Sequence, residues 1–178
     1  MGTKLRGGRT ALSVRPVTLV SDLARGRAKR LLRLAYAILS TIPGIPSIYY
    51  GDEAGLEGYS DPFNRMPYPY GNEDHSLIAY YRRLGKLRRD EDAYKDGVFK
   101  LHIIEKELLV FSREKGGVAL VTVVNNSRRR LSVLADRALC VIDPYSDFKA
   151  SRDEITLDEL RCTVLKVEGN CKLDFIYL

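Results

Sequence analysis

Pro43–Tyr70, PGIPSIYYGDEAGLEGYSDPFNRMPYPY, is the most informative segment of this 178-residue chain. Pro43 and Gly44 are residue types that end helices. The run from Pro46 to Tyr50 is short, apolar and rich in β-branched and aromatic side chains, so it predicts a buried strand. Gly51 then permits a turn of the backbone. Tyrosines, carboxylates and an arginine are interleaved from there to Tyr70. The segment therefore predicts a strand that opens into a long polar loop.

Helical patterns flank this segment on both sides. Upstream, a helix is expected to begin after Ser21, a helix-capping residue type, and to end at Pro43. Its predicted apolar face consists of Ala28, Leu31, Leu32, Ala35, Ile38 and Leu39. Downstream, Asn72 is the expected cap of a second helix. The predicted apolar face of that helix consists of Leu77, Tyr80, Tyr81, Leu84 and Leu87.

From Gly97 onward the apolar pattern changes to the two-residue repeat of strands. Turn residues recur roughly every ten residues, which is typical of an antiparallel sandwich. The predicted strands cover residues 98–104, 108–113, 118–124, 130–134, 139–142, 154–157 and 162–167. Asn125-Asn126-Ser127 matches a glycosylation sequon but is interpreted as a turn. The chain thus divides into a basic, poorly ordered leader (1–21), a helical unit (22–96) and an all-β unit (97–178).

Composition narrows the classes of function. The net charge is +6, and the basic excess is concentrated in residues 1–33, where Asp22 is the single acidic residue. This leader has neither a recognisable nucleic-acid-binding fold nor stacking aromatics, so no nucleic-acid partner is expected. No apolar run reaches the ~18 residues of a membrane span. Without a secretory signal pattern, and with three cysteines lacking zinc-site spacing, we expect a cytoplasmic protein with reduced thiols, no metal and no cofactor.

The segment Gly44–Glu53, GIPSIYYGDE, resembles the short signature on the last barrel strand of the α-amylase family, glycoside hydrolase family thirteen. It is most like the branch of cyclomaltodextrinases, neopullulanases and maltogenic amylases. The segment Asp61–Tyr70 is similar to the substrate-side loop that follows, although the family usually has tryptophan where this chain has Tyr70. The resemblance extends from about Asp22 to Val167. It implies an α+β chain: the last βα part of a (β/α)8 TIM barrel followed by an antiparallel C-terminal β-sandwich.

The resemblance also implies a substrate and two substrate-binding residues. By that match the partner is an α-glucan oligosaccharide, and Asp61 and Arg65 contact a glucose unit on the non-reducing side of the cleaved bond. A carboxylate and a guanidinium together supply the acceptors and donors that sugar hydroxyls require. From the residues alone, an Asp61–Arg65 ion pair that only fixes the loop is the competing interpretation.

Catalytic carboxyl groups are expected to be absent. Retaining glycosidases use two, about 5–5.5 Å apart, and the family carries its nucleophile and acid/base at the ends of the fourth and fifth barrel strands. Asp52 and Glu53 are adjacent at a strand end, so their side chains should point to opposite sides. Glu53 is expected to be a hydrogen-bonded structural carboxylate. His75 and His102 show no serine or cysteine partner pattern in the sequence.

Three interpretations follow. The chain is a C-terminal fragment of a glycoside hydrolase acting on α-1,4-glucans, truncated or frameshifted, with residues 1–20 as out-of-frame translation and no activity alone. Alternatively, it is a non-enzymatic carbohydrate-binding or structural module. The third interpretation is one subunit of a split glycosidase, with a partner chain or a second copy covering the incomplete barrel.

Overall fold

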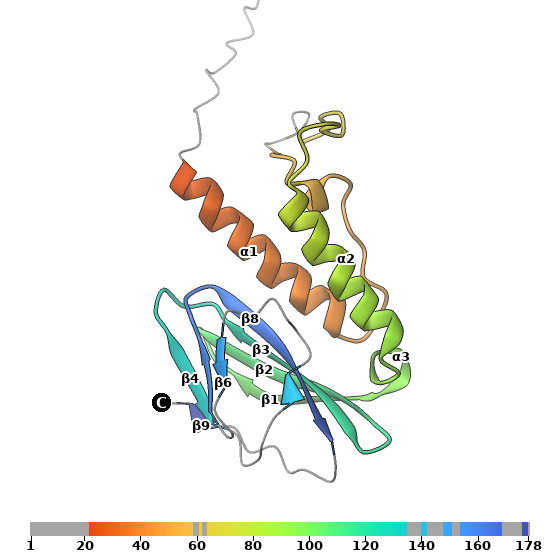
Figure 1. Cartoon of the computed structure of the whole chain (residues 1–178), viewed down its shortest axis with the longest axis vertical. Helices are drawn as coiled ribbons and strands as arrows, with labels where there is room; N and C mark the ends of the chain where they lie inside the picture. Colours follow the sequence, from red (N-terminus) through yellow and green to blue (C-terminus); the bar gives the residue numbers. More distant parts are fainter. Residues whose placement is uncertain are drawn as a thin grey trace, which may run out of the picture.

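The computed structural model describes residues 22–58, 61, 64–134, 140–141, 148–150, 154–168 and 176–177. Within these ranges, a layer of helices lies against one of two antiparallel sheets (Figure 1). The predicted leader at 1–21 lies outside the described residues.

Two long helices form where the sequence predicts them. α1 covers Asp22–Thr41 and α2 covers His75–Asp90, with the one-turn helices η1 (Asp52–Ala54) and α3 (Ala93–Asp96) beside them. The predicted cap of α2 at Asn72 is wrong. Asp74 caps the helix instead, because its side chain accepts the Ser76 and Leu77 N–H groups at 2.9 and 3.1 Å. The Asn72 N–H donates to the Pro69 carbonyl and belongs to the preceding turn.

Nine strands follow among the described residues. They are β1 (Val98–Ile104), β2 (Leu108–Lys115), β3 (Val118–Asn125), β4 (Leu131–Leu134), β5 (Cys140–Val141), β6 (Phe148–Ala150), β7 (Glu154–Leu157), β8 (Arg161–Glu168) and β9 (Ile176–Tyr177). One sheet has the order β1-β2-β3-β8-β5 and the other β6-β7-β4-β9. The seven predicted strands are confirmed. β6 and β9 were missed because they have only two or three residues, too few to show an alternating pattern, whereas the equally short β5 lies within the apolar run 139–142.

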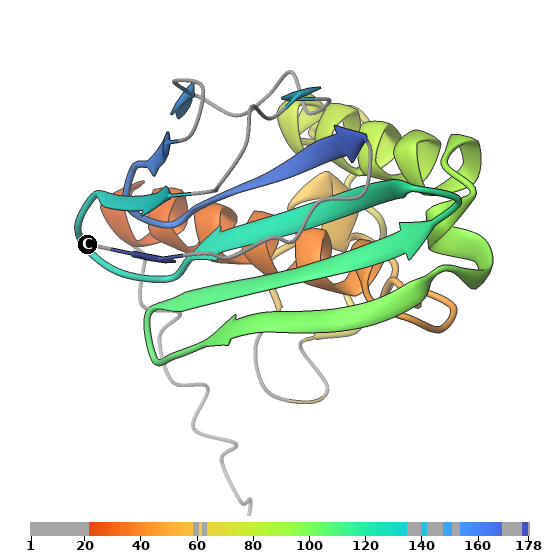
Figure 2. The same cartoon turned by 90° about the horizontal axis from the view of Figure 1, so that it is seen from below.

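The larger sheet is covered on both faces, which explains why β3 is buried along most of its length. On one face, Val121 and Val123 pack with residues of the smaller sheet, including Val133 and Ile155. On the other face, the side chains of β3 meet the helices: Leu120 packs with Tyr94 of α3, and Val124 with Leu34 of α1. Figure 2 shows the helices on one side of the larger sheet. β3 therefore joins the two cores.

The buried face of α1 differs from the predicted one. Leu31 is 38% exposed and Ala35 is also exposed, whereas Leu34 and Ala37 are buried. The reason is that α1 has two neighbours rather than one. Tyr36 and Ala37 pack on α2, and Leu34 packs on the larger sheet. A single helical stripe describes a helix with one partner.

The predicted strand at Pro46–Tyr50 is wrong for this chain. These residues form no strand, and Ile45 and Ile48 are 96% and 43% exposed. A strand requires a neighbour to satisfy its backbone N–H and C=O groups, and no described strand pairs with this segment. The apolar run therefore remains without a partner in the described structure.

Candidate functional site

The loop between α1 and α2, residues 42–74, carries the predicted substrate-binding residues. Its first residues are held by Arg88 of α2. The Arg88 guanidinium donates to the carbonyl oxygens of Ser40 and Ile42 at 2.6 and 3.1 Å, and to that of Gly44. These bonds satisfy carbonyls at the C-terminal end of α1, which have no partners within the helix. Arg88 thereby fixes the point where the loop leaves α1.

A tight turn follows at Gly51. The residue has φ of 89°, a left-handed conformation that favours glycine. A Cβ atom built there would lie 2.7 Å from Leu56 Cδ2, so the turn also requires the absence of a side chain. The Gly51 N–H donates to Glu53 Oε2 at 3.1 Å. The expectation of a hydrogen-bonded structural carboxylate at Glu53 is confirmed.

Asp74 closes the loop. Its N–H donates to the Ala54 carbonyl at 2.8 Å, and its Oδ2 lies 2.6 Å from Lys29 Nζ of α1. Burial alone would raise the pKa of the Asp74 carboxyl. Hydrogen bonds from Lys29, Ser76 and the Leu77 N–H outweigh that effect and hold this pKa well below its usual range. The ionised carboxylate of Asp74 thus ties α1 to α2, and its backbone N–H ties the same residue to η1.

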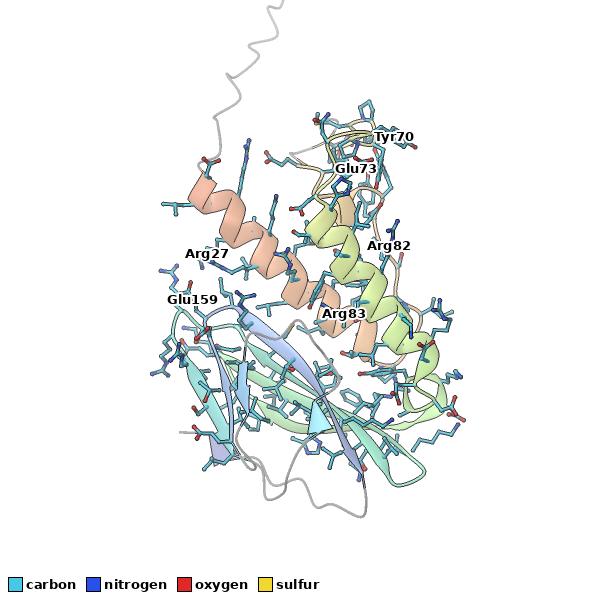
Figure 3. The ribbon with its side chains drawn as sticks, viewed as in Figure 1. Arg27, Tyr70, Glu73, Arg82, Arg83 and Glu159 are labelled. Atoms are coloured by element: carbon cyan, nitrogen blue, oxygen red, sulfur yellow. The ribbon has the colours of Figure 1, made fainter. Side chains whose placement is uncertain are left out.

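Tyrosines gather at the far end of the loop. The Tyr49 and Tyr50 rings lie 4.8 Å apart, and the Tyr50 hydroxyl donates to the Met66 carbonyl at 3.0 Å. The Tyr68 and Tyr70 rings lie 4.9 Å apart. Tyr70 is 82% exposed, and Figure 3 places it at the end of the loop remote from the sheets. Exposed aromatic faces of this kind offer apolar contact area beside polar hydroxyls.

Asp61 and Arg65 are brought together as an ion pair. Arg65 Nε lies 2.8 Å from Asp61 Oδ1, and the two side chains are 70% and 63% exposed. Both groups are therefore accessible to a ligand. The ion pair also fits the competing interpretation, in which it only fixes the loop, although a surface pair of this kind contributes little stability.

Asp52 is a carboxylate in a hollow part of the loop. It lines a cavity of about 240 Å³ together with both tyrosines of the Tyr49–Tyr50 pair, Leu56, Gly58 and Asn64. A second cavity of about 350 Å³ reaches Asp52 from the side of α1, past Lys29 and Glu57. Burial, and then the neighbouring Glu53 carboxylate, raise the pKa of Asp52. The described residues place this acid in a recess that a hydroxyl-bearing ligand can approach.

Sequence analysis missed one polar cluster, on β1 and β2. His102 Nε2 lies 2.9 Å from Ser112 Oγ, and the Ser112 hydroxyl donates to Glu114 Oε1 at 2.8 Å. The Ser112 proton thus points to the glutamate, and the serine is fully buried, so this cluster is no nucleophile for an external substrate. Burial lowers the pKa of the His102 imidazole. His102 and Ser112 are ten residues apart in the sequence, and only the pairing of β1 with β2 reveals that their side chains meet.

Within the described ranges, no group of three or more His, Cys, Asp or Glu side chains is arranged to hold a metal ion. No helix in the same ranges combines the length and apolar character needed to cross a bilayer.

Comparisons with known proteins agree with the resemblance read from Gly44–Glu53. No family model matches the chain. An amylopullulanase of Thermoanaerobacter thermohydrosulfuricus is 36% identical over 93 residues, 52% of this chain and 6% of the relative. A cyclomaltodextrinase of Thermoanaerobacter pseudethanolicus is 34% identical over 110 residues, 61% of this chain and 19% of the relative. The chain spans less than a fifth of these curated relatives.

Comparison with solved structures gives the same result over a larger share of the chain. The crystal structure of an Anoxybacillus α-amylase matches 85% of this chain and 36% of its own, with a TM-score of 0.69 and 26% identity. The α-amylase from H. orenii matches with a TM-score of 0.66 at 21% identity, which bears on the fold alone. The resemblance to α-amylase family enzymes is confirmed, and the described sheets and helices have the arrangement of part of an α-amylase.

Proposed function

We propose that this chain is the C-terminal part of a glycoside hydrolase of the α-amylase type, one that acts on α-1,4-linked glucans. In this proposal, α1, the loop and α2 are the last part of a (β/α)8 barrel. The two sheets are the C-terminal β-sandwich domain. The observation that carries the proposal is the likeness to an α-amylase over 85% of this chain.

The exposed apolar run at the start of the loop supports the same assignment. Ile45, Ile48 and Tyr49 are exposed in an extended segment that no described strand pairs with. A segment with unpaired backbone and apolar side chains is suited to lie between two further strands. The remainder of a barrel would supply them, from the same polypeptide, from a partner chain or from a second copy.

Within that assignment, Asp61 and Arg65 are substrate-binding residues and the chain holds no catalytic carboxylate. Their side chains face solvent near the exposed tyrosines, where a glucose unit can receive hydrogen bonds from Arg65 and donate them to Asp61. The adjacent acids Asp52 and Glu53 are not proposed as a catalytic pair, because Glu53 is bonded to the Gly51 turn.

A non-enzymatic carbohydrate-binding module is the second candidate. The ring pairs Tyr49–Tyr50 and Tyr68–Tyr70 favour it, as does the 240 Å³ cavity that Tyr49 and Tyr50 line. The two candidates differ in what the isolated chain does. The module binds maltoheptaose by itself, whereas the hydrolase part requires the remainder of a barrel to bind and cleave it.

The test is a chimera in which this chain replaces the matching C-terminal part of the Thermoanaerobacter cyclomaltodextrinase. We expect the chimera to hydrolyse maltoheptaose and the isolated chain to release no reducing ends. A folded chimera without activity would contradict the proposal. Calorimetric binding of maltoheptaose to the isolated chain, without hydrolysis in the chimera, would establish the module.

In the chimera, we expect Asp61→Ala to lower kcat/KM for maltoheptaose about tenfold, because a charged hydrogen bond that contributes about 1–2 kcal/mol is lost. Glu57→Ala is the matched control: Glu57 is also an exposed loop carboxylate in an ion pair, with Arg25 at 2.7 Å. Equal rate constants for the two variants would show that Asp61 only fixes the loop.

A further inference from the structure

A cleft on the opposite flank from the tyrosine loop is lined by arginines from three segments. It has a volume of about 430 Å³. The arginines are Arg30 of α1, Arg161 of β8 and the three consecutive residues Arg128, Arg129 and Arg130 of the β3–β4 turn. Figure 3 shows Arg27, one helical turn before Arg30, on the same flank as Glu159. Positive charge is therefore concentrated where α1 meets the ends of the sheets.

The turn that presents the three arginines is held by two buried polar side chains. Asn125 Nδ2 donates to the carbonyls of Arg129, Leu157 and Asp158, at 2.9, 3.1 and 2.9 Å. Ser127 Oγ donates to the Arg129 carbonyl at 2.7 Å and accepts the Arg129 N–H at 3.1 Å. The apparent glycosylation sequon is thus a structural turn, as predicted. The arginines project from a backbone that is fixed before any ligand binds.

The β7–β8 turn on the other side is fixed as well. Leu160 has φ of 51°, which is uncommon for a residue other than glycine. Its side chain is buried against Leu34 and Val124, and its N–H donates to the Ser127 carbonyl at 3.3 Å. The two turns are therefore joined by a backbone hydrogen bond, and their separation is set by the core.

The acids nearby neutralise only part of this charge. Arg130 Nε lies 2.7 Å from Asp158 Oδ1, and Arg30 Nη2 lies 3.3 Å from Glu159 Oε1. Arg128 has no ion pair with the residues that the structure describes. The buried Arg30 Nε also has no hydrogen-bond partner among them. Arg129 Nη2 lies 3.2 Å from Glu107 Oε2, so at least three of the five arginines are ion-paired. Each guanidinium carries five N–H donors, and the pairs leave some of these donors for an anion.

We propose that this cleft binds a small molecule that carries a phosphate monoester or pyrophosphate group. Guanidinium forks match the geometry of phosphate oxygens and form two parallel hydrogen bonds with them, which an ammonium group does not. The cleft is bounded by fixed turns and by α1, which favours a compact ligand over an extended polyanion. The site lies apart from Asp61 and Arg65, so it does not depend on the function proposed above.

The test is calorimetric titration of the full chain with inorganic pyrophosphate at physiological salt. We expect saturable binding of one pyrophosphate per chain. Replacement of both Arg128 and Arg130 by lysine keeps the charge but removes the forks, and we expect it to weaken binding about tenfold or more. Arg82→Ala is the control, because Arg82 is an exposed arginine on α2 (Figure 3), away from the cleft.

Three results would overturn the proposal. The first is no saturable heat with millimolar pyrophosphate. The second is an unchanged affinity in the double lysine variant, which would indicate a diffuse basic surface. The third is tight binding of a single-stranded oligonucleotide that pyrophosphate does not displace. That result would indicate a site for extended polyanions. Because Asn125 and Ser127 hold the turn, the arginine variants should keep the thermal midpoint of the parent, and this is checked first.

Discussion

At the scale of single residues, the loop is organised by side chains that bond backbone groups rather than by the residues predicted to bind sugar. Glu53 fixes the Gly51 turn, Arg88 fixes the exit from α1, and Asp74 caps α2 while it pairs with Lys29. Asp61 and Arg65 bond each other in solvent. The exposed pair is available to a ligand because other residues hold the loop.

Asp74 makes the stability of the fold depend on pH. The pKa of its carboxyl is lower in the folded state than its unfolded value of about 3.9. Its contribution is therefore present above about pH 4 and is lost as the pH falls through the folded pKa. We expect Asp74→Ala to lower the free energy of unfolding at neutral pH by about 1–2 kcal/mol, through the lost cap.

Urea unfolding between pH 2 and 7 checks this prediction. Asp74→Asn should lose less at neutral pH, because an asparagine side chain still caps the helix. It should also flatten the dependence on pH below about 4. Asp92→Ala is the control, since Asp92 precedes α3 without a side-chain cap bond and its pair with Lys95 is exposed. If the free energy of unfolding of Asp74→Asn fell with pH as steeply as that of the parent, the role assigned to the Asp74 carboxylate would be contradicted.

At the scale of secondary structure elements, sequence patterns succeeded where a segment meets its partners along one clear face. The Leu77–Tyr80–Leu84 face of α2 and the long strands β1, β2, β3 and β8 were predicted on this basis. The run Pro46–Tyr50 has the composition of a strand, yet composition does not supply a neighbour to bond with. For the same reason the His102–Ser112 contact was invisible, because it depends on strand register.

The junction between α1 and the loop is held by the side chain of one residue, Arg88. Arg88→Ala leaves the Ser40, Ile42 and Gly44 carbonyls without its guanidinium, and hydrogen bonds to charged groups contribute about 1.5–3 kcal/mol. We expect a loss of about 2–3 kcal/mol in the free energy of unfolding, and faster amide hydrogen exchange in residues 42–56. Arg89→Ala, at the exposed neighbouring position, should change neither. Equal losses in the two variants would contradict the role of Arg88.

At the scale of the whole molecule, the described helices and sheets share packing that crosses the predicted boundary between residues 22–96 and 97–178. Leu34 of α1 packs with Val124 of β3 and Leu160, and Tyr94 of α3 packs with Leu120 and Val164. Neither the helix pair nor the sheets would bury these side chains alone. The boundary itself stays a prediction, since shared packing is compatible with two domains in contact.

One unfolding transition is therefore expected for helices and sheets together. Near-ultraviolet dichroism reports largely on tyrosines such as the stacked Tyr36–Tyr81 pair between α1 and α2, and far-ultraviolet dichroism reports on the backbone of both parts. The two signals should share one urea midpoint. Leu34→Ala should move both midpoints together, with a loss of about 2–4 kcal/mol for a buried leucine. Leu31→Ala, on the exposed face of the same helix, should move them little. Separate midpoints, with only the tyrosine signal shifted by Leu34→Ala, would instead establish residues 22–96 as a unit that unfolds alone.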